Sequence, residues 1–381
     1  MNSSISALKS ILGNYLENEN IYFHYKGRVS LFTILKAMGI GKGDEVIIPA
    51  YTCVVVPNPI IYLGAKPIYV DINAATFNMD ASKIEERINS KTKAIIIQNT
   101  YGLSSEVEEV LQIAKKNQLY TIEDCTHGFG GSYNGEINGS YCDAAFYSSQ
   151  WNKPFSSGLG GFLVVNNTDL IANINALEKE KVEPSYFSRF VLKLLYFIRR
   201  YLITDKSYFF FVRFYRLLSK MNLIIGSSSG GEINSTEMPA GFFMNYSETQ
   251  AKEALRSIKN FDAVLKLRKE NALKYSRLLK EKNKKYVDLQ LFDNHSFLKY
   301  PILVSDREAF LEKAVKNNIP MGDWFLSVIH PVQKDFEQWF INPEDYPVAH
   351  EISQHILNLP TDTIQVEKVI EFLTKNIEDI V

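Results

Sequence analysis

Four polar residues near the middle of the chain are of types that can do chemistry together. Asp124 and Ser148 each end an apolar run. His127 comes shortly after Asp124, and Lys153 stands in a loop that leads to a pair of glycines. Taken alone, an aspartate at such a place caps the next helix, and a loop lysine is a solvated charge. Taken together, they offer an amine that can form an imine with a carbonyl compound, beside a carboxylate, an imidazole and a hydroxyl.

The apolar runs that lead to these residues predict a largely parallel sheet buried on both faces. They are continuous rather than alternating in polarity, and helical stretches at 82–89 and 105–117 lie between some of them. This is the pattern of β–α–β units in an α/β layer. Functional residues gather at the carboxyl ends of such strands, where Thr52, Asp124 and Ser148 fall. The predicted strands are 46–48, 67–71, 94–99, 120–124, 144–147 and 161–165.

An enzyme that uses pyridoxal 5′-phosphate (PLP) needs groups of these kinds. A lysine forms the imine and moves the proton, a carboxylate keeps the pyridine nitrogen protonated, another group stacks on the ring, and further groups hold the phosphate. A helix that begins near Gly27 would present free N–H groups and its positive end to that phosphate. The candidate cofactor-binding residues are Gly27, Arg28, Val29, Thr52, Asp124, His127, Ser148 and Lys153.

Seven short segments follow one another in a fixed order, namely 43–52, 63–71, 92–102, 122–125, 148–161, 247–251 and 356–360. In this order they resemble the sugar aminotransferases of the DegT/DnrJ/EryC1/StrS family, which are fold type I PLP enzymes. The resemblance implies an α/β fold, with a mostly parallel sheet of the seven-stranded type between helices and a smaller α+β C-terminal domain. It divides the chain into a large cofactor-binding domain at 1–240 and a small domain at 241–381.

The resemblance also implies a role for each matched position. Lys153 matches the lysine that holds the cofactor as a Schiff base and catalyses the reaction, and Asp124 matches the partner of the pyridine nitrogen. His127 matches the ring-stacking residue, and Ser148 a phosphate ligand. The segment Gly27, Arg28 and Val29 matches the backbone amides that hold the phosphate. Trp324 and His330 lie where relatives place substrate-pocket residues, although a structural role for His330 is equally open.

The activity implied by the resemblance is transamination of a keto sugar carried on a nucleotide, with glutamate as the amino donor. The product would serve surface glycan or related aminosugar biosynthesis, and the enzyme would be a homodimer. Two alternatives stay open, a PLP-dependent sugar dehydratase and a non-catalytic scaffold of a glycan-assembly complex. Lys153 argues against the first, because deoxygenating relatives replace this lysine. The intact set of four polar residues argues against the second.

Several positions depart from the family pattern. Arg28 replaces a small residue of a Ser-Gly-Thr-Ala run, and a guanidinium there could bind the phosphate through two N–H groups. Phe243 stands where relatives bring an asparagine from the second subunit, a loss for which Arg28 would compensate. Cys53 replaces an aromatic residue after Thr52. We therefore expect the cofactor chemistry to be retained and the recognition of the substrate to differ.

An insertion at 184–226 is dense in aromatic and basic residues. It is interpreted either as helices that pack on the fold or at a dimer interface, or as a surface that touches a membrane. A glycine- and serine-rich loop at 226–231 is expected to be flexible.

The net charge of −1 does not favour nucleic acid as a partner, and the sequence has no CxxC pair that would indicate a metal site. With three cysteines and neither a signal peptide nor a membrane span, a cytoplasmic location is expected.

Overall fold

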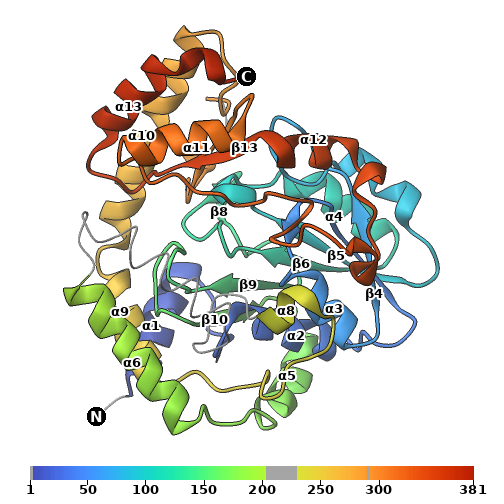
Figure 1. The fold of residues 1–381 in the computed structure, drawn as a ribbon. Coiled ribbons are helices and arrows are strands. Elements are labelled where there is room, and N and C mark those ends of the chain that lie inside the picture. The colour runs from blue at the N-terminus through green and yellow to red at the C-terminus, as the bar shows by residue number, and fades with distance from the viewer. Residues whose placement is uncertain (1–2, 203–229, 290–291) are drawn as a thin grey trace.

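The computed structural model describes residues 3–202, 230–289 and 292–381, and its centre is a seven-stranded sheet (Figure 1). The strand order is β1–β10–β9–β6–β5–β2–β4. From β9 to β4 the strands are parallel, whereas β10 runs antiparallel to both of its neighbours. The strands are β1 (Ile21–His24), β2 (Glu45–Pro49), β4 (Lys66–Val70), β5 (Thr92–Gln98), β6 (Tyr120–Asp124), β9 (Ala144–Ser148) and β10 (Gly161–Val165). The α/β class and the six strands predicted from the sequence are confirmed.

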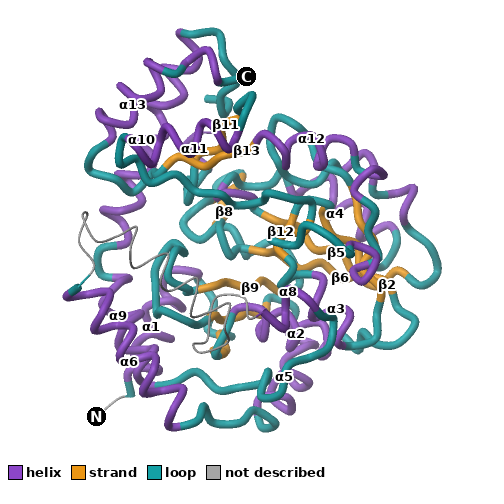
Figure 2. The backbone as a smooth tube through the Cα atoms, in the orientation of Figure 1, coloured by secondary structure: helices purple, strands orange, loops and turns teal. Residues whose placement is uncertain are grey.

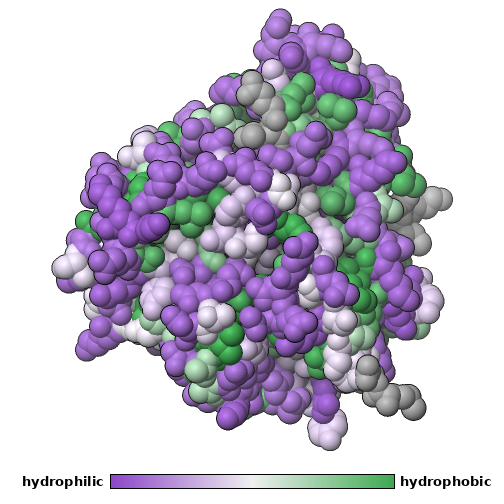
Figure 3. Space-filling model, turned by 180° about the vertical axis from the view of Figure 1, so that it is seen from behind, coloured by the Kyte–Doolittle hydropathy of each residue, from purple (hydrophilic) through white to green (hydrophobic). Residues whose placement is uncertain are grey.

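Helices cover both faces of this sheet, because successive residues of a strand point to opposite sides. Val46 belongs to the apolar cluster that includes α2 (Gly27–Ala37), whereas the next residue, Ile47, packs with Val110 of α4 (Val107–Lys116). Seen from behind, the outer surface is mostly hydrophilic, with apolar side chains in separate patches (Figure 3). The other helices on this part of the chain are α1 (Ser4–Leu16), α3 (Pro57–Tyr62) and α5 (Ile171–Glu178).

The last third of the chain forms a smaller group of helices around a two-stranded antiparallel sheet (Figure 2). Its elements are α10 (Phe261–Glu281), β11 (Tyr300–Leu303), α11 (Arg307–Lys316), α12 (Pro347–His355), β13 (Ile356–Leu359) and α13 (Val366–Lys375). The predicted strand near 300–304 and the helix from Val366 are confirmed. The division at residue 240 stays a prediction. Beyond that residue, α9 (Glu248–Ile258) still packs in one cluster with α1.

Two helical predictions were wrong in detail. Residues 82–89 form two short 3₁₀ turns, η1 (Ala81–Lys83) and η2 (Glu85–Arg87), because a segment this short makes few helical hydrogen bonds. The long helical stretch predicted from 254 to 279 is broken between α9 and α10. After the break, Phe261 begins α10 and packs with Phe129 in the cluster around α1. The chain therefore turns so that this aromatic ring is buried.

The insertion at 184–226 is described only in part. Its first half forms α6 (Tyr186–Tyr201), whose inner side buries Leu192 and Tyr196 against the body of the protein. The remainder, from residue 203, lies outside the described residues. The same holds for most of the loop predicted at 226–231, whose last two residues begin the short helix α8 (Gly230–Asn234). The interpretation of α6 as a helix that packs on the fold is supported by this inner side.

Candidate active site

Three of the predicted site residues lie together at one end of the central sheet. Asp124 is the last residue of β6 and Ser148 is the last residue of β9. These two strands are parallel neighbours, so their carboxyl ends meet. Lys153 stands in the loop between β9 and β10, and its side chain is half-buried. The sheet topology thus brings an amine, a carboxylate and a hydroxyl to one edge.

The environment of Lys153 raises the fraction of its amine that is neutral. Burial lowers the pKa of Lys153 to about 8, although the nearby Cys53 and Asp124 act in the opposite direction. An ordinary lysine has a pKa near 10.4 and is almost wholly protonated at neutral pH. A lysine with a pKa of about 8 keeps a usable fraction of free amine, which is the nucleophilic form. Lys153 is therefore suited to attack a carbonyl carbon.

Asp124 is a buried carboxylate that interacts electrostatically with this amine. Its side chain is only 3% exposed, and Oδ1 accepts a hydrogen bond from the Thr126 N–H at 2.9 Å. Burial raises the pKa of Asp124, and the Thr126 hydrogen bonds and the charge of Lys153 oppose that rise. A cationic ligand group beside Asp124 would stabilise its charged form. The site is thus built to receive a positively charged or protonated group.

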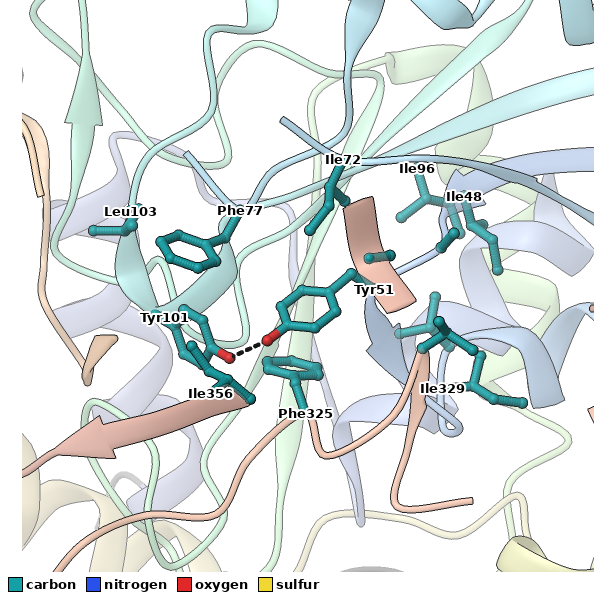
Figure 4. Packing of buried hydrophobic residues seen from close by; sticks show 14 of the residues in the cluster. Ile48, Tyr51, Ile72, Phe77, Ile96, Tyr101, Leu103, Phe325, Ile329 and Ile356 are labelled. Atoms are coloured by element: carbon teal, nitrogen blue, oxygen red, sulfur yellow. Dashed lines mark hydrogen bonds between the residues drawn. The ribbon is translucent and has the colours of Figure 1, made fainter. Parts of the chain in front are cut away.

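His127 is held as a neutral imidazole. Its Nδ1 accepts a hydrogen bond from the Tyr101 N–H at 3.2 Å, which leaves the proton on Nε2. Burial first, and then the charge of Lys153, hold the pKa of His127 well below its usual range. Tyr101 is fixed in turn, because its hydroxyl lies 2.7 Å from that of Tyr51, beside Phe325 (Figure 4). A packed aromatic wall therefore sets the orientation of the imidazole.

Trp324 covers one face of the His127 ring. The two rings are stacked, with centroids 4.9 Å apart and an interplanar angle of 20°. Lys153 Nζ lies 4.9 Å from the centroid of the same indole. The predicted pocket residue Trp324 is thus brought next to both Lys153 and His127. A ligand ring that stacks on this face of His127 would have to displace the indole.

The N-terminus of α2 lies against the end of β9. A Cβ atom added to Gly27 would stand 3.1 Å from Ser148 Cβ and 3.0 Å from the Tyr147 carbonyl oxygen. A Cβ at Gly161 would lie 2.3 Å from Gly27 Cα, so only glycine allows this approach of the backbones. The approach places the positive end of the helix beside the Ser148 hydroxyl, as an anion site requires. One predicted donor is already engaged, because the Val29 N–H donates to the Lys26 carbonyl.

Arg28 contacts an acidic residue that the sequence did not single out. Its Nη1 lies 2.5 Å from Glu232 Oε1, and Lys26 Nζ lies 3.4 Å from Glu232 Oε2. All three residues are largely or wholly buried, and burial lowers the pKa of Lys26 to about 8. Glu232 belongs to α8 and is far from Arg28 along the chain, so no local spacing could have revealed the pair. Two cations against one carboxylate still leave this end of α2 electropositive.

Thr52 and His330, the remaining predicted residues, lie on two short strands that pair with each other. Thr52 donates its hydroxyl to Gln98 Oε1 at 2.6 Å, so its oxygen is positioned by the sheet. The short strand β3 (Thr52–Cys53) pairs in parallel with β12 (Ile329–His330) from the C-terminal part. The Leu326 N–H lies 3.4 Å from Nδ1 of His330. This pairing carries the segment from Trp324 to His330 to the edge of the site.

The geometry fits the cofactor expected from the sequence. An amine, a buried carboxylate, a neutral imidazole and a helix N-terminus beside a serine are the groups that PLP would contact. The glycine contact brings the first turn of α2 against Ser148, so the helix N–H groups and the serine hydroxyl that would hold the phosphate lie together.

A sequence model of the DegT/DnrJ/EryC1/StrS aminotransferase family matches residues 3–374. The chain belongs to this family. Among curated relatives, the GDP-perosamine synthase of Caulobacter vibrioides is 38% identical over 159 residues, which are 42% of this chain and 43% of that relative. A dTDP-3-amino-3,6-dideoxy-α-D-galactopyranose transaminase of Aneurinibacillus thermoaerophilus is 38% identical over 165 residues, 43% of this chain and 46% of that relative. The chain thus spans less than half the length of these two relatives.

Solved structures show that the likeness in fold extends over the whole chain. The structure of NtdA from Bacillus subtilis, with the cofactor PMP bound, has a TM-score of 0.73 and 22% sequence identity to this family member. The superposition covers 99% of this chain and 78% of NtdA. Fold type I architecture is therefore shared well beyond the segments that align in sequence.

Proposed function

We propose that this chain is a PLP-dependent aminotransferase that transfers an amino group from glutamate to a keto sugar linked to a nucleotide. The observation that carries the proposal is the half-buried Lys153, with a pKa of about 8, beside the buried Asp124. Membership of the family supports it, as do relatives whose names refer to GDP-linked and dTDP-linked amino sugars. The product would enter surface glycan or related aminosugar biosynthesis.

The geometry supports a proposed role for each of these residues. When bound, PLP supplies a carbonyl that forms imines with amines and a ring that accepts their electrons. Lys153 would hold this group, and after release its free amine would move a proton between the substrate carbon and the cofactor. Asp124 would keep the pyridine nitrogen protonated, and His127 would fix the plane of the ring. Ser148 and the first turn of α2 would bind the phosphate.

A spectroscopic titration tests this function. Purified protein mixed with PLP is expected to develop the absorption band of a lysine-bound cofactor, and L-glutamate should remove it. A keto sugar nucleotide should then restore the band, and the product should contain an amine by mass spectrometry. A sugar consumed without gain of nitrogen would instead favour the dehydratase. A protein that develops no band would favour the scaffold and contradict the proposal.

We also propose that the enzyme is a homodimer in the cytoplasm. The family resemblance supports the dimer, and the three cysteines support a reducing compartment because all of them are unpaired. None of the helices in the described ranges is long and apolar enough to cross a membrane.

The outer face of α6 supports a proposed contact with an anionic membrane surface. Five side chains on this face, here called the α6 stripe, recur every three or four residues and are 46–70% exposed. They are Phe187, Phe190, Leu194, Phe197 and Tyr201. The helix carries Arg189, Lys193, Arg199 and Arg200, and its fully described sequence contains no acidic residue. An aromatic stripe beside basic side chains is suited to the interface of an anionic bilayer.

Replacing Phe187, Phe190 and Phe197 with serine is expected to lower binding to phosphatidylglycerol vesicles by at least about tenfold, because apolar area is lost from the contact. Co-sedimentation with these vesicles, and with neutral phosphatidylcholine vesicles, measures the effect. The matched control is Ile364→Ser, since Ile364 is 88% exposed away from α6. Wild-type protein that binds neither vesicle, or a stripe variant that only loses self-association in sedimentation velocity, would contradict the membrane contact.

A further inference from the structure

A second lysine lies near the indole that Lys153 approaches. Lys299 Nζ lies 5.8 Å from the centroid of the Trp324 indole, the ring that Lys153 Nζ approaches to 4.9 Å. The Lys299 N–H donates to the Tyr101 carbonyl oxygen at 3.1 Å, and the Tyr101 N–H donates to His127. The backbone of Lys299 is therefore held by the same residue that orients the imidazole. None of the roles described above uses its ammonium group.

Three segments converge behind Lys299. The Asn271 side chain on α10 donates to the Thr361 carbonyl at 2.8 Å, and the Thr361 hydroxyl donates to the Leu298 carbonyl at 3.1 Å. These bonds bring together the residues next to them, which are Arg268, Asp362 and Lys299. Arg268 Nη2 lies 3.7 Å from Asp362 Oδ2. Asp362 also interacts electrostatically with Lys299, so one carboxylate is shared by two cations and the group keeps a positive charge.

Arg268 has more hydrogen-bond donors than its surroundings use. The residue is only 3% exposed, and its Nε and Nη1 have no hydrogen-bond partner among the residues that the structure describes. Unsatisfied N–H groups of a buried guanidinium are costly, and native proteins satisfy nearly all such groups with protein, water or ligand. A purely structural Arg268–Asp362 pair would leave these two nitrogens unexplained. It would also give no reason for Lys299 to face Trp324.

We propose that Lys299 and Arg268 form a subsite that binds an oxyanion of the substrate near Trp324. The inference rests on the proposed aminotransferase function and identifies how its substrates are held. The favoured source of the oxyanion is a carboxylate of the dicarboxylic amino donor. The donor's amine would have to reach the cofactor that Lys153 would hold, and its carboxylates lie within the length of one amino acid from that amine. A phosphate of the nucleotide-linked sugar has the same chemistry.

Calorimetric titration with unreactive anions tests the subsite without turnover. Glutarate serves as the dicarboxylate probe, and GDP and dTDP serve as phosphate probes, each added to PLP-loaded and to cofactor-free protein. Lys299→Gln is expected to weaken glutarate binding by at least about tenfold, because a hydrogen bond to a charged group is lost. PLP affinity should change by less than about twofold. Lys266→Gln is the matched control, since this lysine lies on α10 with its side chain 80% exposed.

The outcomes distinguish a donor carboxylate from a sugar phosphate as the ligand, and they test the subsite separately from the aminotransferase function. Weakened binding of GDP or dTDP, with glutarate unaffected, would support the subsite and identify the sugar phosphate as its ligand. Equal affinity of wild type and Lys299→Gln for all three anions, or no binding of any anion to wild type, would overturn it. Arg268→Lys should also weaken binding of the same anion whose binding Lys299→Gln weakens. A thermal melting curve checks that the Arg268→Lys variant is folded. If PLP gives no absorption band, the aminotransferase function fails, yet the cofactor-free titrations still decide the subsite.

Discussion

Replacing Lys153 with alanine is expected to lower the rate of amino transfer by about 10⁴-fold or more. Lys153 is the amine at the carboxyl end of the sheet that interacts electrostatically with Asp124, and its lowered pKa of about 8 supplies a fraction of free base. The variant loses both the group that would hold the cofactor and the base that would move the proton. Single-turnover absorbance with L-glutamate and PLP-loaded protein measures the loss.

A matched control separates this chemistry from damage to the loop. Asn152 is the exposed neighbour of Lys153 in the same turn, so Asn152→Ala should change the rate by less than about twofold. Lys153→Ala should still fold, because a partly buried ammonium is removed and an apolar methyl remains. Added methylamine should restore part of the lost rate, since a small amine can enter the space left by the side chain. A Lys153→Ala enzyme within tenfold of wild type, in the absence of added amine, would contradict the assigned role.

The sequence was sufficient for the part of the site that depends on strand ends. Continuous apolar runs identified β6 and β9, and parallel neighbours in such a sheet must bring their last residues together. The amino-acid pattern alone therefore predicts that Asp124 and Ser148 lie near each other. The position of Lys153 near these two residues could also be predicted, because its loop leaves β9 at the same edge of the sheet. The closeness of Gly27 to Ser148 was implied only by the family resemblance, since α2 is distant in sequence.

The other contacts of the site depend on packing between distant segments. Glu232 reaches Arg28 from a glycine- and serine-rich stretch that carries no helical or strand periodicity. Trp324 stacks on His127 because β12 pairs with β3, and strands of two residues leave no readable pattern. Buried charges such as Arg268 look, in a sequence, like any exposed arginine of an amphipathic helix. Residue type and local spacing predict chemistry, but not which distant charge neutralises another.

The pairing of Arg28 with Glu232 changes how the family departure is interpreted. A guanidinium that contacts a buried carboxylate at 2.5 Å is oriented by that carboxylate, and Lys26 shares the same partner. Arg28 would then strengthen the positive end of α2 as part of a fixed charge cluster rather than as a flexible side chain. Phosphate binding is still proposed for this helix end, with Glu232 as the residue that positions Arg28.

Replacing Asp124 with asparagine is expected to lower the rate of amino transfer by about 10²- to 10³-fold, with a smaller change in the affinity for glutamate. The amide oxygen can still accept the Thr126 N–H, so the geometry of the loop after β6 is kept. The negative charge that would hold the pyridine nitrogen protonated is lost. Because burial raises the pKa of Asp124, a neutral amide should not destabilise the fold, and thermal melting should show an unchanged or higher Tm.

Glu123 offers a close control for this charge. It is the preceding residue of β6, is 1% exposed, and accepts hydrogen bonds from Asn99 and the Gly139 N–H rather than facing Lys153. Glu123→Gln removes a buried carboxylate at the same depth on the opposite side of the strand, so the rate should change by less than about threefold. The absorption spectrum of bound PLP should shift with Asp124→Asn and not with Glu123→Gln, because only the former changes the charge beside the ring nitrogen. If both variants lose activity equally, the loss reflects the stability of β6, and Asp124 has no special role toward the cofactor.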